Sequence, residues 1–321
     1  MDKKIFLPIE NELAEFQKQF SSTLKSKVAL LDIILKYILK QKGKKIRPAL
    51  VLLSAKFSGD VNHRTYIAAN LVELLHTATL IHDDVVDEAK TRRGLASINA
   101  VWKNKISVLI GDYLLAQGLL LSLDNDECRF LKTTSLAVKQ MSEGELLQIQ
   151  KARNFDATED TYFQVIKYKT ASLIKTCCSL GAQSTTKDEK IISAISGYGE
   201  NLGIAFQLRD DYLDYAGRKK MLGKAIGNDI KEKKFTLPLI YSLKNAPKSH
   251  SSKIMKIIKS GTAPKFNEVV KFVQDYGGLE YTIKKTKEYC NTALSYISDY
   301  ADSQVKDSLV ALLDFVSDRE N

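Results

Sequence analysis

Apolar residues recur along the 321-residue chain at the spacing of amphipathic helices. The clearest case lies between residues 67 and 81, where the apolar positions follow a period of about 3.6 residues. These positions are Ile67, Leu71, Leu74, Leu75, Ala78 and Ile81. Sustained alternation of apolar and polar residues, which is typical of strands, is hard to find. No proline stands between Pro48 and Pro238, and a proline inside a helix costs about 3 kcal/mol or more. The pattern predicts an all-α protein.

The expected helices cover most of the chain and leave short connections. Segments 245–250 and 261–264 contain the Gly and Pro residues typical of loops, and Gly217 is placed to end the helix before it. No linker rich in Pro, Ser or Gly divides the sequence, so we expect residues 1–321 to form one large domain. The expected helices are 10–40, 46–57, 63–88, 100–124, 127–152, 158–181, 188–216, 233–244, 251–260, 265–275, 279–300 and 303–317.

The formal net charge of +10 is compatible with binding nucleic acid, a membrane surface or anionic small molecules. The lysines are spread along the sequence and interleaved with acids. Short basic clusters stand near aspartate triplets, which would repel a nucleic-acid backbone. This distribution favours an anionic small molecule, and no nucleic-acid partner is expected.

Cysteine usage and the N-terminus indicate the compartment. Cys177 and Cys178 are adjacent in an apolar run and no C-x-x-C pair occurs, which is typical of buried free thiols in a reducing compartment. The first residues have no apolar core of signal-peptide length, and no 18-residue apolar stretch is found. We therefore expect a cytoplasmic protein.

Two aspartate triplets of the form D-D-x-x-D are the strongest chemical signal. They are Asp83, Asp84 and Asp87, and Asp210, Asp211 and Asp214. On a helix each would place three carboxylates around one turn, where like charges repel. Their flanks are too apolar for a solvated helix, so each triplet is expected in a cleft that holds a cation. Oxygen ligands without Cys or clustered His favour Mg²⁺, which is usually held by one or two carboxylates and substrate phosphates.

Short basic clusters supply the complementary charge. They lie at residues 43–48, 92–94, 169–170 and 218–224. Lys and Arg bind phosphate oxygens through charge-assisted hydrogen bonds, so acid and base together indicate a diphosphate joined to the triplets by Mg²⁺. A solvated surface group is the alternative for any single cluster, but it is much less favoured for two matching triplets inside apolar helices.

The motifs follow one another in a characteristic order. They are Leu75-His76-x5-His82-Asp83-Asp84-x2-Asp87, Arg92-Arg93-Gly94, Lys169-Thr170, Gln207-x2-Asp210-Asp211-x2-Asp214 and Thr236-Leu237-Pro238. Over residues 42–238 the chain thereby resembles the trans-isoprenyl diphosphate synthases, or polyprenyl synthetases, and is most like their long-chain members. The resemblance implies helices around a central apolar cavity, and a Mg²⁺-dependent condensation of isopentenyl diphosphate with an allylic diphosphate.

The resemblance also implies roles for single residues. The first triplet would bind two Mg²⁺ on the allylic diphosphate, and the second, chiefly Asp210, a third. Both triplets would serve as metal ligands, and the catalytic group would be Asp83, Asp84, Asp87, Asp210 and Lys169. The allylic diphosphate would be held by Arg92, Lys169, Lys224 and Lys234. Isopentenyl diphosphate would be held by Lys44, Arg47, His76 and Arg93. The cavity would be lined by Thr170, Gln207, Glu145 and Gln148.

Two segments depart from the family pattern. The family has Gly-Gly-Lys where this chain has Lys42-Gly43-Lys44, and Glu-Gly-Lys where it has Glu232-Lys233-Lys234. The second departure leaves open whether Lys233 or Lys234 reaches the diphosphate. His76 has the alternative role of a core residue, since it stands on an apolar helix.

Two residues near the first triplet bear on product length. In the family, the residue five positions before the first Asp faces the growing chain; here it is Ala78, with Thr79 after it. Short-chain enzymes usually carry Phe or Tyr there. A helix turn rises about 5.4 Å, close to one extended isoprene unit, so a tail could run along positions 78, 74/75 and 71 to a floor near Leu115 to Leu119. We therefore expect a product on the order of 25 to 45 carbons, of the kind used for a quinone side chain.

Several alternatives stay open. They are a short-chain (farnesyl or geranylgeranyl) synthase, a non-catalytic subunit of a heteromeric synthase, and a terpene cyclase. Both triplets are intact and the isopentenyl diphosphate residues look complete, which disfavours the last two. The resemblance implies a homodimer, and a long product together with the +10 charge indicates loose peripheral contact with membranes.

Overall fold

A computed structural model of the chain describes residues 3–41, 43, 45–154, 157–216, 234–260 and 266–317. The helices of the first half are η1 (Lys3–Ile9), α1 (Glu10–Thr23), α2 (Ala29–Lys40), α3 (Ile46–Ser58), α4 (His63–Val86), α5 (Ile98–Leu123) and α6 (Cys128–Asn154). Those of the second half are α7 (Glu159–Ile166), α8 (Ser172–Thr185), α9 (Glu189–Ala216), α11 (Leu237–Asn245), α12 (Lys248–Ser260), α13 (Phe266–Asp275), α14 (Gly278–Ser295) and α15 (Gln304–Ser317). A π turn, η2 (Lys167–Ala171), joins α7 to α8, and a small hairpin pairs β1 (Thr91–Arg92) with β2 (Leu95–Ala96).

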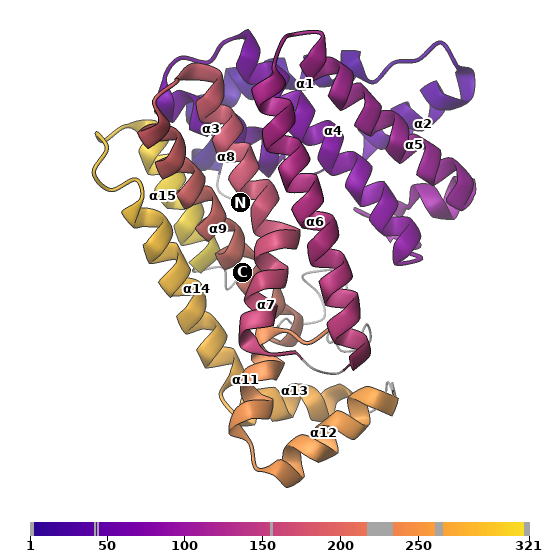
Figure 1. Ribbon diagram of the computed structural model, residues 1–321, viewed down its shortest axis with the longest axis vertical. Coiled ribbons are helices and arrows are strands. Elements are labelled where there is room, and N and C mark those ends of the chain that lie inside the picture. The colour runs from indigo at the N-terminus through magenta and orange to yellow at the C-terminus, as the bar shows by residue number, and fades with distance from the viewer. Residues whose placement is uncertain are drawn as a thin grey trace.

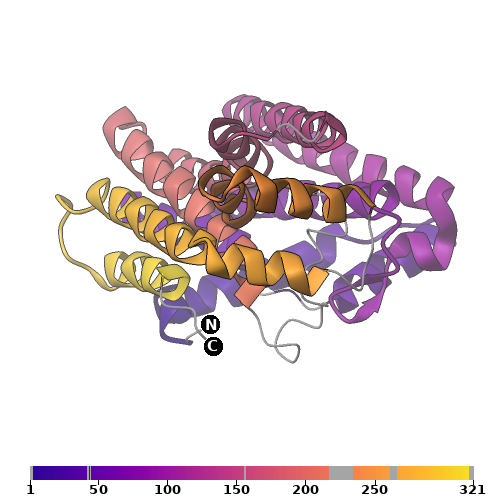
Figure 2. The same cartoon turned by 90° about the horizontal axis from the view of Figure 1, so that it is seen from below.

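Helix α8 lies at the centre of the bundle. It packs against α3 and α9, and α14 packs against α9 in turn (Figure 1). Twelve of its 14 residues are buried, so it is enclosed on all sides rather than on one face. Helices α11, α12 and α13 form a smaller group at one end of the long helices, which Figure 2 shows from that end. The expectation of an all-α fold is confirmed.

Helix α4 carries the first aspartate triplet on its last turn. It begins at a capping box in which Asn62 accepts a hydrogen bond from the backbone of Arg64 at 2.9 Å, and Thr65 accepts one from the backbone of Asn62. It ends at Val86, because Glu88 has a φ of 50° and cannot continue the helix. Three carboxylates therefore stand at the negative end of the helix dipole, which raises the cost of leaving them without a cation.

The expectation of one helix over residues 10–40 is wrong, because the chain turns between Leu24 and Val28. The backbone N–H of Val28 donates to the hydroxyl of Ser26 at 3.1 Å, a local bond that competes with helical pairing. Leu24 is buried at this corner, so α1 and α2 pack as two helices around it.

Two other local features were not expected. The helix predicted over 158–181 contains the π turn and runs on to Thr185. The hairpin at 91–96 turns on Arg93 and Gly94, whose φ angles of 52° and 79° suit the two-residue turns that twist with the strands. Most other predicted helix boundaries agree within about four residues, and α14 ends at Ser295 rather than at residue 300.

Helix α5 corrects the expectation that no long apolar stretch exists. By length and composition alone it is long and apolar enough to cross a membrane, and a third of its most apolar 18-residue window (33%) is buried in the bundle. Between Val108 and Leu123 it carries one charged residue, Asp112. It is capped by Ser97, whose hydroxyl accepts a hydrogen bond from the backbone N–H of Ala100, and it packs along α4.

Candidate active site

The three carboxylates of the first triplet differ in exposure. Asp84 is buried, Asp83 is half-buried and Asp87 is exposed. Nε of Arg92 donates a hydrogen bond to Oδ1 of Asp84 at 2.9 Å, and Nη2 of the same guanidinium contacts the same oxygen. Arg92 belongs to β1, so this ion pair fixes the hairpin to the end of α4.

Asp83 faces charged groups on two other elements. Lys169 of the π turn and Glu145 of α6 form an ion pair, and both interact electrostatically with Asp83. Burial raises the pKa of Asp83; Lys169 opposes the rise, and Glu145 and Asp87 add to it. The end of α4 therefore lies close enough to the π turn and α6 for their charges to interact.

The π turn passes unusually close to α6. A Cβ at Gly144 would lie 2.9 Å from the backbone nitrogen of Lys169 and 2.9 Å from Cβ of Tyr168, so a glycine is needed at this position of α6. The close approach places Glu145, the next residue of α6, beside the Lys169 ammonium. Single π turns inside helices are frequent at functional sites, and this one presents Lys169 and Thr170 together.

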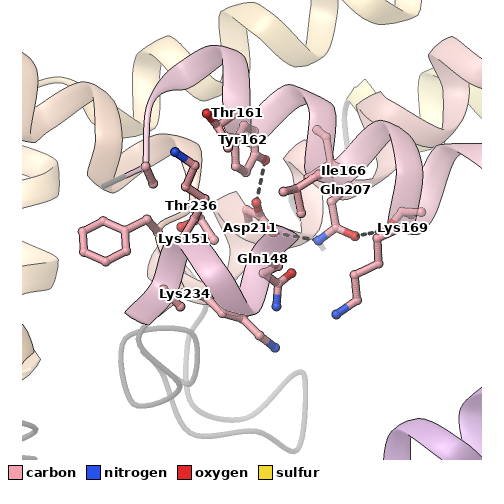
Figure 3. A pocket seen from close by; sticks show the side chains of 15 residues that line it. Gln148, Lys151, Thr161, Tyr162, Ile166, Lys169, Gln207, Asp211, Lys234 and Thr236 are labelled. Carbon is pink, nitrogen blue, oxygen red and sulfur yellow. Dashed lines mark hydrogen bonds between the residues drawn. The ribbon is translucent and has the colours of Figure 1, made fainter. Parts of the chain in front are cut away.

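A hydrogen-bond chain orders the second triplet (Figure 3). Asp211 is buried on α9; its Oδ2 accepts from the hydroxyl of Tyr162 at 2.6 Å, and its Oδ1 from Nε2 of Gln207 at 2.8 Å. The amide oxygen of Gln207 accepts from the hydroxyl of Thr170 at 2.9 Å. Both oxygens of Asp211 are thus bound by the chain itself, whereas Asp210 is exposed and Asp214 is half-buried.

The pocket in Figure 3 is enclosed by α6, α7, the π turn, α9 and the segment before α11. Lys169 and Lys234 both line it, together with Gln148, so two of the expected diphosphate-binding lysines meet here. Lys151 of α6 adds a third cation that the sequence analysis did not single out. Lys224 lies outside the described residues.

A second and larger pocket, of about 530 Å³, is bounded by α1, α2, α4 and the hairpin. Lys45, Arg92 and Arg93 supply positive charge to its wall. His76 is buried and Arg47 is half-buried close by, and both interact electrostatically with Arg93. Lys44, the remaining expected ligand of isopentenyl diphosphate, lies outside the described residues.

The chemistry of Arg47 and His76 fits an anionic ligand. Burial holds the pKa of His76 well below its ordinary value, and Arg47, Arg93 and Arg92 lower it further, so the imidazole is neutral near pH 7. Nε of Arg47 and Nε2 of His76 are buried and have no hydrogen-bond partner within the described part of the chain. Buried polar atoms are normally satisfied, and diphosphate oxygens have the lone pairs that these donors need.

Glu73 is a residue of this pocket that the sequence analysis missed. It lines the pocket wall, and burial raises the pKa of its carboxyl, while Arg47, Arg93 and Lys45 oppose that rise. It stands three residues before His76, so both fall on one face of α4. That spacing was the available signal, but one Glu on an apolar helix does not stand out.

The aspartates fit a divalent cation that is shared with a substrate. Their donor set is oxygen only, which suits a hard ion. In the parts of the chain that the structure describes, no three acidic, His or Cys side chains already converge in a cage for a metal. Such a site matches a cation held by a few carboxylates and by phosphate oxygens rather than by protein alone.

The sequence profile of the family described as Polyprenyl synthetase matches residues 28–276. The chain belongs to the polyprenyl synthetase family. It is 36% identical to the all-trans-nonaprenyl-diphosphate synthase (geranyl-diphosphate specific) of Rhodobacter capsulatus, over 98% of this chain and 97% of that one. It is 35% identical to the octaprenyl diphosphate synthase of Escherichia coli, over 92% of each.

Solved structures of polyprenyl synthetases have the same fold. The crystal structure of a polyprenyl synthase from Caulobacter crescentus, complexed with calcium and isoprenyl diphosphate, aligns with a TM-score of 0.92 at 30% identity, covering 99% of this chain and 98% of that one. A decaprenyl diphosphate synthase from Rhodobacter capsulatus aligns with a TM-score of 0.92 at 32% identity, with the same coverage. The expected isoprenoid synthase fold and the prenyltransferase activity are confirmed, and the protein is an enzyme of isoprenoid biosynthesis that uses a divalent metal.

In this polyprenyl synthetase, the residues expected to set product length lie in two places, an apolar crevice and a packed cluster beside it. An apolar crevice between α4, α5 and α6 is lined by Leu71, Leu75, Leu114, Leu115, Gly118, Leu119, Thr134, Ser135 and Val138. Ala78 lies one turn nearer the first triplet, where it is fully buried in a cluster with Leu74 and Leu114. The hydroxyl of Thr79 donates to the backbone carbonyl of His76 at 2.9 Å. The crevice thus contains Leu71, Leu75, Leu115 and Leu119 of the expected path, while Leu74 and Ala78 belong to the adjoining packed cluster.

Proposed function

We propose that this prenyltransferase is a Mg²⁺-dependent long-chain polyprenyl diphosphate synthase that binds three Mg²⁺ per active site, the number that the resemblance to its family implies. The observation that carries the proposal is that Asp83 lies close enough to the Lys169–Glu145 ion pair to interact with both charges, while Lys169 lines one pocket with Asp211. The apolar crevice is lined by Leu71 and Leu75 of α4, which precede the first triplet on the same helix.

The allylic diphosphate would be held in two ways, through metal ions bound to the two triplets and through hydrogen bonds from the basic residues. Asp83 and Asp87 would hold metal from one side and Asp210 from the other, with Asp211 and Asp214 supporting Asp210. When bound, Mg²⁺ would withdraw charge from the diphosphate and lower the barrier to breaking its C–O bond. Lys169 and Lys234 would donate charge-assisted hydrogen bonds to its remaining oxygens.

Arg92 requires a separate account, because its guanidinium already binds Asp84. As a planar group with five donors it can hold the carboxylate and still present other N–H groups to a phosphate. In this proposal Asp84 orients Arg92 toward the allylic diphosphate, in addition to the metal-ligand role expected of the whole triplet.

Isopentenyl diphosphate would occupy the pocket of Arg47, His76 and Arg93. The neutral His76 can donate a hydrogen bond from its one N–H group to a phosphate oxygen, but it cannot act as a general acid near pH 7. The π-bond of isopentenyl diphosphate attacks the allylic cation, and the proton then lost passes to the departing diphosphate. Apolar walls on α4 and α5 would exclude water, which would otherwise capture the cation.

We propose a product on the order of 25 to 45 carbons, from the turn count along α4. The names of relatives support this range, since they include nonaprenyl, octaprenyl and heptaprenyl diphosphate synthases. A short-chain isoprenyl diphosphate synthase of Methanothermobacter thermautotrophicus is also similar, at 32% identity over 87% of each chain, so the short-chain function is the second candidate.

One assay tests both the activity and the length. Purified protein is incubated with Mg²⁺, labelled isopentenyl diphosphate and an allylic primer, and the extracted product is sized by chromatography. A long product that depends on Mg²⁺ supports the proposal. A product that stops at about 15 or 20 carbons would favour the second candidate, and no product would exclude an active homomeric enzyme.

We also propose a cytoplasmic homodimer with loose, salt-sensitive contact to membranes. The exposed apolar face of α5 supports the dimer. The +10 charge supports the salt-sensitive contact with membranes. One relative is named component 2 of a heptaprenyl diphosphate synthase in Bacillus subtilis, so a heteromer is the alternative assembly. Light scattering of the purified chain distinguishes a dimer from a monomer that awaits a second component.

A further inference from the structure

One hydrogen-bond chain attaches the segment around Lys169 to α9 (Figure 3). Tyr162 of α7 stands seven residues before Lys169, and Thr170 of the π turn stands directly after it. The hydroxyl of Tyr162 donates to Asp211 at 2.6 Å, and the hydroxyl of Thr170 donates to Gln207 at 2.9 Å. Gln207 in turn donates to Asp211 at 2.8 Å, one turn farther along α9. The chain is therefore anchored on both sides of Lys169.

The chemistry of Asp211 sets the direction of these hydrogen bonds. A carboxylate only accepts, so the N–H group of the Gln207 amide points to Asp211 and its carbonyl oxygen points to Thr170. The hydroxyl of Thr170 then has to donate. Tyr162 and Asp211 are both buried, and the bond between them keeps the carboxylate from rotating. A single buried hydroxyl thus sets the orientation of three polar side chains on two other elements.

The contacts of Lys169 with α6 are less directional. The backbone of the turn packs closely against Gly144, and the Lys169 ammonium pairs with Glu145. Van der Waals contact depends weakly on orientation, and a lysine side chain can follow its partner over several rotamers. Hydrogen bonds, in contrast, weaken steeply when their angle changes. The chain that ends at Tyr162 is therefore the contact with a neighbouring helix that fixes the direction in which the turn presents Lys169.

We infer that Tyr162 is a positioning residue of this enzyme. Through Asp211 and Gln207 it holds Thr170, and with it the π turn, at the place from which Lys169 reaches the allylic diphosphate. Its own hydroxyl is occupied by Asp211, so it acts through Lys169 rather than on the substrate. This role rests on the proposed contact between Lys169 and the allylic diphosphate.

The test is a double-mutant cycle of Tyr162 and Lys169. Tyr162→Phe keeps the ring and removes the hydroxyl, which leaves a buried carboxylate oxygen without this donor. The Michaelis constant for the allylic diphosphate should rise about tenfold, and that for isopentenyl diphosphate should stay as in the wild type. The variant that combines Tyr162→Phe with Lys169→Ala should bind the allylic diphosphate no more weakly than Lys169→Ala alone, because effects of residues that act through one another do not add.

A second readout does not depend on turnover. Calorimetry with an unreactive sulfur analogue of geranyl diphosphate, in the presence of Mg²⁺, should give the same pattern of binding constants across the cycle. Thr170→Val removes the hydroxyl at the other end of the chain and should raise the same constant by a similar factor. It decides the matter if Tyr162→Phe fails to fold.

Tyr198→Phe is the matched control. Tyr198 is buried on α9, and its hydroxyl donates to the backbone carbonyl of Leu309 at 2.8 Å. The substitution removes a hydroxyl of the same kind from a site that has no contact with the hydrogen-bond chain of Tyr162. Its melting temperature should fall, as that of Tyr162→Phe should, but both Michaelis constants should equal those of the wild type. The comparison separates positioning from support of the fold.

Three results would overturn the role of Tyr162. They are a Tyr162→Phe protein with the wild-type Michaelis constant for the allylic diphosphate, equal rises for both substrates, and a double variant whose loss is the product of the two single losses. In each case Lys169→Ala still shows its own effect, so the proposed function stands. A Lys169→Ala protein with the wild-type constant for the allylic diphosphate would instead refute the proposed contact of Lys169, and the role of Tyr162 with it.

Discussion

Half-buried Arg92 on the hairpin and buried Asp84 on α4 form an ion pair in the middle of the first aspartate triplet, with 2.9 Å between Nε and Oδ1. Neighbouring carboxylates of one motif therefore have different surroundings. Asp83 interacts electrostatically with Lys169 and Glu145, while Asp84 is bound by a cation of the chain itself. The two should respond differently to the same substitution.

Asp83→Ala should lose roughly 10³-fold or more in turnover, because a metal ligand contributes several kcal/mol and each 1.36 kcal/mol is tenfold in rate. Its melting temperature should stay close to that of the wild type. Asp84→Ala should lose turnover too, but it also leaves the half-buried guanidinium of Arg92 without its partner, which costs about 1–3 kcal/mol of stability. Thermal unfolding and steady-state kinetics measure both effects; equal melting temperatures for the two variants would contradict the structural role of Asp84.

Glu73 gives a prediction about pH. Burial raises the pKa of its carboxyl above the value in the unfolded chain, so the folded state binds this proton more tightly than the unfolded state does. Stability is therefore lost as pH rises through the ordinary range of a glutamate toward the raised pKa. Glu73→Gln, which stays neutral, should be more stable than the wild type at pH 7 to 8, and the difference should vanish as pH falls below the ordinary glutamate value. Denaturant unfolding at several pH values measures this, and a difference that does not change with pH would refute it.

Lys169 and Arg93 should separate the two substrates. Each donates a charge-assisted contact worth about 1.5–3 kcal/mol, or roughly 10- to 100-fold in binding. Lys169→Ala should raise the Michaelis constant mainly for the allylic diphosphate, and Arg93→Ala mainly for isopentenyl diphosphate. Lys167→Ala is the matched control, since Lys167 lies on the same π turn but pairs with Glu200 at 3.1 Å. Equal changes for both substrates in both variants would show that the pockets are assigned wrongly.

Substitutions along α4 should act as a ruler of product length. Ala78→Tyr should stop the product at roughly 15 to 20 carbons, and Leu71→Phe, about two turns farther from the triplet, should allow about two more isoprene units. Because Ala78 is fully buried, Ala78→Tyr should also cost about 1–3 kcal/mol of stability from overpacking. Chromatography of extracted products and thermal unfolding measure these effects. If both variants give the same product, the tail does not follow this face of α4.

Much of the fold could be predicted from the sequence because it depends on one repeating pattern, the recurrence of apolar residues about every 3.6 positions. The spacing of apolar residues defines long buried helices such as α4 and α9, and the absence of proline allows them to be long. Local exceptions depend on single hydrogen bonds or turn residues instead. The corner at Ser26 and the hairpin at Arg93 and Gly94 are examples, since neither changes the apolar period around it.

The candidate site was predictable where residue type decides the chemistry. Carboxylate triplets and basic clusters can be recognised in the sequence by residue type alone. The structure brings Asp83 and Lys169 close enough to interact, although they are 86 positions apart in the sequence. What the sequence could not supply is which carboxylate of a motif is already bound. That Asp84 is held by Arg92 and Asp211 by Tyr162 depends on how distant elements pack.

The π turn separates the position of Lys169 from the packing of the core. Its hydrogen bonds run from residue i to i+5, so it holds about one residue more per turn than an α-helix does. Removing one residue would let α7 continue into α8 as an ordinary α-helix, and the buried side chains of α8, among them Leu173 and Cys177, would still face α3 and α9. The widened backbone that passes close to Gly144 and places Lys169 beside Glu145 would be lost. A deletion of one residue at this point is therefore expected to remove the Lys169 contact while the core stays packed.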